Sequence, residues 1–166
     1  MGFMRDFFGG FIEGIVGAPA ARAGSGNGSQ RGRIERLCHE LGWSVDEREG
    51  NSIGLYFNSS DGEMRKVRIS NGGKSIVGFY AHSDVILPAH RVPPNLPGYL
   101  LRRNLEDSGI GMWGISVDDD DEVTFHLCYM ALGEGLNAET LKYICESLAN
   151  EAADFDGKLR DAGLID

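Results

Sequence analysis

The sequence predicts an α+β domain, in which an antiparallel sheet of about five strands is packed against helices. Short runs of alternating apolar residues, typical of half-buried strands, occur over residues 43–69 and 112–130. Segments with an apolar residue at every third or fourth position, typical of amphipathic helices, precede, separate and follow these runs. The predicted order is therefore helix, three or four strands, helix, two strands and a long final helix.

The folded domain is predicted to span residues 31–166 and to begin with a helix. Ile34, Leu37 and Leu41 share one face of this helix, and Gly42 follows as a C-terminal stop. Three short strands are expected next, and the following apolar run at 75–87 predicts a further buried strand or one that bends at Gly78 and around Ser83. The side chains that mark the three short strands are Trp43 with Val45, then Ile53, Leu55 and Phe57, then Val67 and Ile69.

The second half of the domain is predicted to hold a short helix, a strand pair and a long helix. The strand pair covers 112–117 and 122–130, and the acidic residues between them form its turn. Asn137 can cap the final helix, whose apolar stripe continues as far as Gly163. The short helix is marked by Leu96, Leu100, Leu101 and Leu105.

Residues 1–16 form a predicted apolar, amphipathic N-terminal arm, and residues 17–30 a flexible Gly/Ala/Ser linker. Phe7, Phe8 and Phe11 lie in the apolar stripe that the arm would present as a helix. Four glycines weaken such a helix, since each costs roughly 0.5–1 kcal/mol relative to alanine. We therefore expect the arm to become ordered only against another surface.

Charge and cysteine content narrow the classes of function. The net charge of −9 argues against nucleic acid as a partner, and residues 106–166 are especially acidic. Cys38, Cys128 and Cys145 are widely spaced within apolar patterns, which is typical of reduced core thiols rather than of a disulfide framework. These thiols, and an N-terminus without the pattern of an export signal, predict a cytoplasmic protein.

Motifs for metal or cofactor chemistry are not recognised. Five consecutive acidic residues at 118–122 lack the alternation of a calcium loop and are more simply a solvated hairpin turn. His126 and Cys128 share a strand face, but no second ligand pair at zinc-finger spacing accompanies them. The glycine-rich segments lack phosphate-binding signatures. We expect no metal and no cofactor.

A catalytic centre is likewise not predicted. His82, Ser83 and Asp84 are adjacent on an extended chain, so their side chains cannot align as a hydrolase triad. An enzyme would need titratable groups gathered from distant parts of the chain, and His82, His90 and Asp84 are the candidates for such a cluster. We therefore predict a protein without catalytic residues.

The chain resembles the YbjN family, most clearly in its second half, and this family is related in fold to the class I chaperones of type III secretion. The resemblance covers about residues 31–162 and is carried by Asn104 near the end of a short helix, a strand entry at 109–113, the acidic turn, and Phe155 late in the last helix. It implies an α-β-β-β-α-β-β-α domain, commonly dimeric and non-enzymatic, that serves bacterial cells as a chaperone, adaptor or regulator. It also implies a client held on apolar patches of the first helix and the sheet.

The expected function is therefore binding of an amphipathic or unfolded polypeptide segment in an apolar groove. The expected partners are a protein or peptide client and a second copy of the chain. The candidate partner-binding residues are Ile34, Leu37, Leu41, Phe7, Phe8 and Phe11. The alternatives are attachment to a membrane or scaffold through the N-terminal arm, which carries a single basic side chain, and an unrecognised enzyme.

Overall fold

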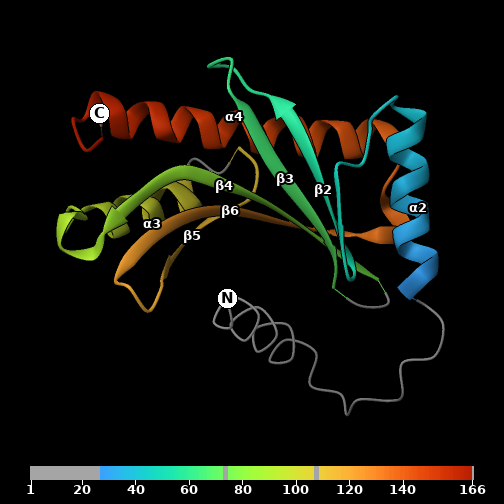
Figure 1. Ribbon diagram of the computed structural model, residues 1–166, viewed down its shortest axis with the longest axis horizontal. Coiled ribbons are helices and arrows are strands. Elements are labelled where there is room, and N and C mark those ends of the chain that lie inside the picture. The colour runs from blue at the N-terminus through green and yellow to red at the C-terminus, as the bar shows by residue number, and fades with distance from the viewer. Residues whose placement is uncertain (1–26, 73–74, 107–108, 166) are drawn as a thin grey trace, which may run out of the picture.

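The structure, a computed structural model, describes residues 27–72, 75–106 and 109–165 (Figure 1). The helices of this part are α2 (Asn27–Glu40), α3 (Leu96–Glu106) and α4 (Ala138–Asp161). The strands are β1 (Glu47–Glu49), β2 (Ser52–Asn58), β3 (Met64–Asn71), β4 (Ile76–Pro88), β5 (Met112–Val117) and β6 (Glu122–Leu132). The predicted α+β class is confirmed.

The strands form one antiparallel sheet in the order β1-β2-β3-β4-β6-β5. The first four strands follow one another as a meander. The chain then passes through α3 and returns as the β5–β6 hairpin, which places β6 beside β4 and leaves β5 at the outer edge. The sheet therefore has two edge strands, β1 and β5.

All three helices pack against the same face of the sheet. α4 runs across the strands, with most of its contacts to β4 and β3, while α3 lies along β5 and α2 stands at one end (Figure 1). Alternate strand residues meet these helices in one core cluster. Phe155 of α4 is central to it, with ring centroids 4.3 Å from Trp113 and 5.4 Å from Phe125. Burying each such ring stabilises the fold by about 1.5–3 kcal/mol.

The ends of α4 follow the predicted signals. The side chain of Asn137 accepts a hydrogen bond of 2.8 Å from the backbone N–H of Thr140, as an N-cap does. Gly163, just beyond the helix, has a φ of +68°, a conformation that glycine adopts without steric cost. Both predicted boundaries of the final helix are confirmed.

The first strand lies elsewhere than predicted. Trp43 and Val45 precede the sheet, and the ring of Trp43 packs edge-on against Phe57 with 4.9 Å between centroids. β1 instead consists of three exposed, charged residues, which show no apolar alternation and so escaped prediction. It brings the sheet to six strands rather than about five. α2 begins at Asn27, so that the last residues of the predicted linker are helical.

Candidate functional site

The face of the sheet opposite the helices is the first candidate site, and we call it the open face. Its side chains alternate with those of the core cluster, and none of the described helices lies over it (Figure 1). Its main members on β4, β5 and β6 are Tyr80, His82, Met112, His126, Cys128, Met130 and Leu132, and the charged side chains of Lys66 and Arg68 lie on the same face of β3.

Two glycines shape the centre of the open face. A Cβ at Gly114 would lie 2.4 Å from Nε2 of His126, and one at Gly78 would lie 2.6 Å from the hydroxyl oxygen of Tyr80. The imidazole and the phenol ring therefore lie flat over neighbouring backbone. His82 is the cross-strand partner of His126, and their ring centroids are 6.2 Å apart. The result is a flat, largely uncharged floor of aromatic and imidazole groups.

Burial governs the electrostatics of this floor. It lowers the pKa of His126 to about 4, with a smaller contribution from His82. The pKa of His82 is also lowered, first by burial and then by the positive charges of Arg68 and Lys66. Burial raises the pKa of the Cys128 thiol to about 12. At neutral pH the floor therefore holds two neutral imidazoles and a protonated thiol, which is a poor nucleophile.

Apolar side chains border this floor on the central and outer strands. Leu132 is 68% exposed, Met112 54% and Met130 40%. Apolar side chains gathered in this way on one surface mark an interaction site more often than scattered ones do. The thioether of methionine adapts to differently shaped partners, which suits a surface that binds apolar polypeptide.

The free edge at β5 is the second candidate site. Edge strand β1 carries only charged side chains, which discourage pairing with another strand, whereas β5 carries none. On β5 the amide of Asn104 accepts from the backbone N–H of Trp113 at 2.7 Å and donates to its C=O at 3.0 Å. Asn104 thus takes the place of a neighbouring strand at that residue, and among the described strands none pairs with the outer edge of β5.

Exposed leucines of α3 flank this edge. Leu101 is 63% exposed and Leu105 80%, and they lie one helical turn apart on α3, the helix that contacts β5. We refer to Leu101, Leu105 and the outer edge of β5 as the edge surface. It combines two exposed leucines of a helix with strand backbone that no other described strand pairs with.

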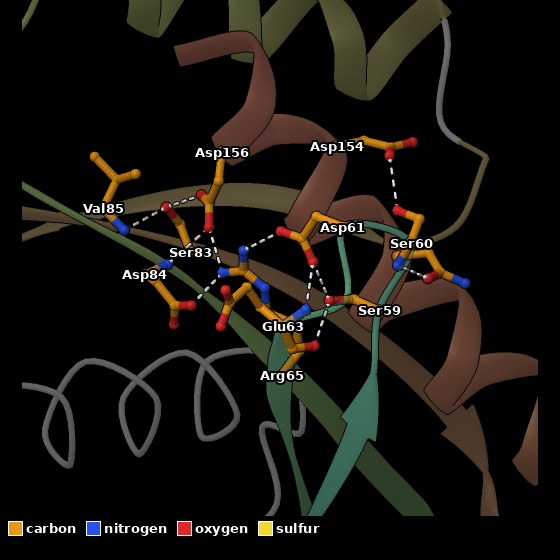
Figure 2. A network of polar contacts seen from close by, with 11 residues as sticks. Ser59, Ser60, Asp61, Glu63, Arg65, Ser83, Asp84, Val85, Asp154 and Asp156 are labelled. Carbon is orange, nitrogen blue, oxygen red and sulfur yellow. Dashed lines mark hydrogen bonds and ion pairs between the residues drawn. The ribbon is translucent and has the colours of Figure 1, made fainter. Parts of the chain in front are cut away.

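The third candidate site is a buried polar network between the sheet and α4 (Figure 2). The guanidinium of Arg65, 1% exposed, pairs with Asp156 of α4, with Asp84 of β4, and with Asp61 of the β2–β3 turn at 2.8 Å. The hydroxyl of Ser83 donates to Asp156. Hydrogen bonds from Ser59 and Arg65 keep the pKa of Asp61 well below its usual range.

This network holds the fold together. Between His82 and Ile86 the pairing of β4 with β6 shifts, and backbone donors of this bulge point away from the sheet ladder. Asp156 accepts from the N–H of Asp84 at 3.0 Å, and the Ser83 hydroxyl accepts from the N–H of Val85 at 3.0 Å. The network therefore ties together the bulge, the hairpin turn and α4.

The structure does not assemble the enzyme candidates considered above. His82 projects from the open face, while Ser83 is bonded to Asp156 on the helix side. His90 lies exposed in a short 3-10 helix beyond the end of β4. Asp84 is paired with Arg65. Within the described residues these groups do not converge on a common point.

Other polar features have structural accounts. The acidic run forms the β5–β6 turn, in which the Asp118 side chain accepts from the N–H groups of Asp120 and Glu122. Across the described ranges, no group of three or more His, Cys, Asp or Glu side chains is arranged to hold a metal ion. A hollow of about 280 Å³ lies between α3 and α4, lined by Tyr99, Arg102, Arg103, Glu106 and Lys158.

The residues predicted to bind a partner are placed unevenly. Ile34 is 4% exposed and belongs to the core, whereas Leu37 and Leu41 are half-buried and pack against it. Phe7, Phe8 and Phe11 lie outside the described residues. The sequence predicted that the sheet takes part in client binding but named none of its residues, although the alternation of His126, Cys128 and Met130 with core residues of β6 was the signal for them.

The α+β fold is like that of a type III secretion chaperone of known structure. The solved structure of the Yersinia pestis type III secretion chaperone SycH, in complex with a stable fragment of YscM2, matches with a TM-score of 0.51. The match has 16% sequence identity and covers 75% of this chain and 98% of that one. No family model matches the chain, and no curated protein matches its sequence. At this identity the likeness concerns the fold.

Among the described helices, none is long and apolar enough to cross a membrane. The three cysteines are free thiols, with Cys38 and Cys145 buried in the core and Cys128 half-buried.

Proposed function

We propose that the protein is a non-enzymatic, cytoplasmic protein-binding module, chaperone-like or adaptor-like, that holds an amphipathic or unfolded polypeptide segment on the open face of its sheet. The observation that carries this proposal is the row of exposed apolar side chains, Met112, Met130 and Leu132, along a face that no described helix covers. The likeness to a chaperone solved with a bound protein fragment supports it.

Binding would be driven by burial of apolar surface, because neither the open face nor the client segment can bury its apolar side chains alone. Each square ångström of apolar surface removed from water is worth about 25 cal/mol, before the cost of ordering the client. Leu37 and Leu41 of α2 can add to the contact because part of each side chain is still accessible. Ile34 cannot, because its side chain is buried in the core. The YbjN relationship implied by the sequence remains part of this proposal.

The test is suppression of aggregation of a chemically unfolded, reduced test protein, followed by light scattering with the full chain. Met112→Glu/Met130→Glu should lose most of the suppression, because a client segment would have to desolvate two carboxylates. Tyr143→Glu is the matched control, since Tyr143 is 62% exposed on α4, across the sheet from the open face. Equal suppression by all three proteins, or none by the unaltered chain, would refute the proposal.

We also propose that the chain pairs with a second copy through the edge surface. Leu101 and Leu105 would pack against their counterparts, and the later part of β5 would pair across the two-fold axis. Light scattering after size exclusion should give a dimer for the full chain and a monomer for Leu101→Asp/Leu105→Asp. A dimer that persists in this variant would place the interface elsewhere.

A further inference from the structure

The centre of the open face is more buried than a bare sheet face. His126 is 3% exposed, and Tyr80, His82 and Cys128 are half-buried, although no described helix lies over them. Toward the ends of the same strands the side chains are exposed, as Ile86 of β4 and Leu132 of β6 show. Part of this burial arises because the rings of His126 and Tyr80 lie flat over Gly114 and Gly78, and a cover over the middle of β4 and β6 would account for the rest.

We propose that the chain's own N-terminal arm, residues 1–16, lies on the open face and occupies the place of a client. The inference deepens the proposed function and rests on it, since the arm is a built-in substitute for the client segment. The arm suits the site because its stripe is strongly apolar. It contains Phe3, Phe7, Phe8, Phe11, Ile12, Ile15 and Val16.

The chain enters the fold beside this face. A Cβ at Gly133 would meet the side-chain amide of Gln30, in the first turns of α2, at 1.9 Å. The start of α2 therefore abuts the residue that follows Leu132, at the end of β6. A segment that precedes Asn27 begins next to the exposed end of the open face.

The lengths also agree. Residues 17–26 can span up to roughly 33 Å when extended, which is enough to reach His126 from the end of β6. As a helix the arm would be about 24 Å long, and the distance from Leu132 to His126 along the strand is about 20 Å. A linker of this length holds the arm at a local concentration in the millimolar range, which favours it over a free client.

Cys128 is the natural reporter because it lies under the proposed cover. In the full chain, its alkylation by iodoacetamide at pH 8 should be nearly as slow as that of the core residues Cys38 and Cys145. In Phe7→Asp/Phe11→Asp the cover should leave, and the rate at Cys128 should rise by about a hundredfold as its thiolate becomes accessible. Cys38 and Cys145 should stay unreactive, which shows that the fold is intact.

The matched control is Ala18→Asp/Ala20→Asp, which adds the same charge to the linker and should leave Cys128 protected. If Cys128 reacts equally fast in the unaltered chain and in the arm variant, the inference is wrong. Protection that is lost on dilution would assign the cover to the arm of a second copy and would also overturn it.

A second measurement avoids dependence on the aspartate variants. A benzophenone side chain in place of Phe11 should crosslink, within one chain, to peptides from β4 or β6 on irradiation. Crosslinks found only elsewhere would overturn the inference.

To separate this failure from failure of the proposed function, a synthetic peptide of residues 1–16 is added to the arm variant. Renewed protection of Cys128 shows that the face binds apolar polypeptide, whether or not the tethered arm does so.

Discussion

Replacing Asp156 by alanine should be among the most destabilising single changes in this domain. The carboxylate is fully buried and serves Arg65, the Ser83 hydroxyl and the backbone N–H of Asp84. Removing one partner of a buried ion pair lowers the free energy of unfolding by about 3–5 kcal/mol. Hydrogen-bond donors left without an acceptor lower it further, but their separate costs do not simply sum. Because Arg65 keeps Asp61 and Asp84, we expect a loss near the middle of this range, about 4 kcal/mol.

For a domain of this size such a loss should lower Tm by about 12 °C. The assay is urea unfolding of the full chain followed by tryptophan fluorescence, which Trp43 and Trp113 provide. Asp84→Ala is the matched control, since its side chain is 66% exposed and its pair with Arg65 should contribute less than about 1 kcal/mol. If Asp156→Ala costs no more than Asp84→Ala, the network does not stabilise the fold as argued.

Three further predictions concern the sheet and the thiols. His126 has a folded-state pKa of about 4, below its ordinary 6.5, so protons favour the unfolded chain and stability should fall as the pH drops below 6.5. Between pH 7 and pH 5 the loss should be about 2 kcal/mol by urea unfolding, and His126→Gln should flatten that slope. Asn104→Ala should cost about 1–2 kcal/mol and increase self-association in sedimentation, because it frees the backbone of Trp113 for pairing, whereas Asn58→Ala, at the exposed end of β2, should do neither. Cys145 should resist alkylation at pH 8 in the folded chain and react fully in 6 M guanidinium, since burial raises its pKa well above the ordinary value; fast reaction of the folded chain would contradict this.

Periodicity was sufficient to predict the helices and most strands, because buried side chains repeat at the spacing of the element that buries them. The stripe of α4 and the alternation in β6 are examples. β1 escaped prediction because an exposed, charged edge strand carries no such pattern. Its pairing depends on a tight turn, in which Gly50 has a φ of +53°.

The candidate sites were harder to predict, because each joins residues that are distant in the sequence. Arg65 stands close to Lys66 and Arg68 in the sequence, a pattern typical of a solvated strand face, yet its partner Asp156 lies 91 residues further along the chain. Asn104 and Trp113 were both singled out by the resemblance, but nothing in their spacing predicts that the amide of one would pair with the backbone of the other. Likewise, an apolar stripe on a helix does not say that Ile34 would face inward and Leu101 outward.

The position of Arg65 has a consequence for the chain before it is fully folded. The inner face of β3 is otherwise apolar around this residue, with Val67 and Ile69 following it on the same side. Until α4 packs against the sheet and Asp156 pairs with Arg65, the guanidinium of Arg65 remains hydrated in the middle of that apolar surface. A hydrated charge there opposes sheet-to-sheet association between incomplete chains, as gatekeeper residues do in aggregation-prone strands. The side chain of Arg65 thus stabilises the folded domain through its ion pairs, and before folding is complete it opposes aggregation through the exposed core face of β3.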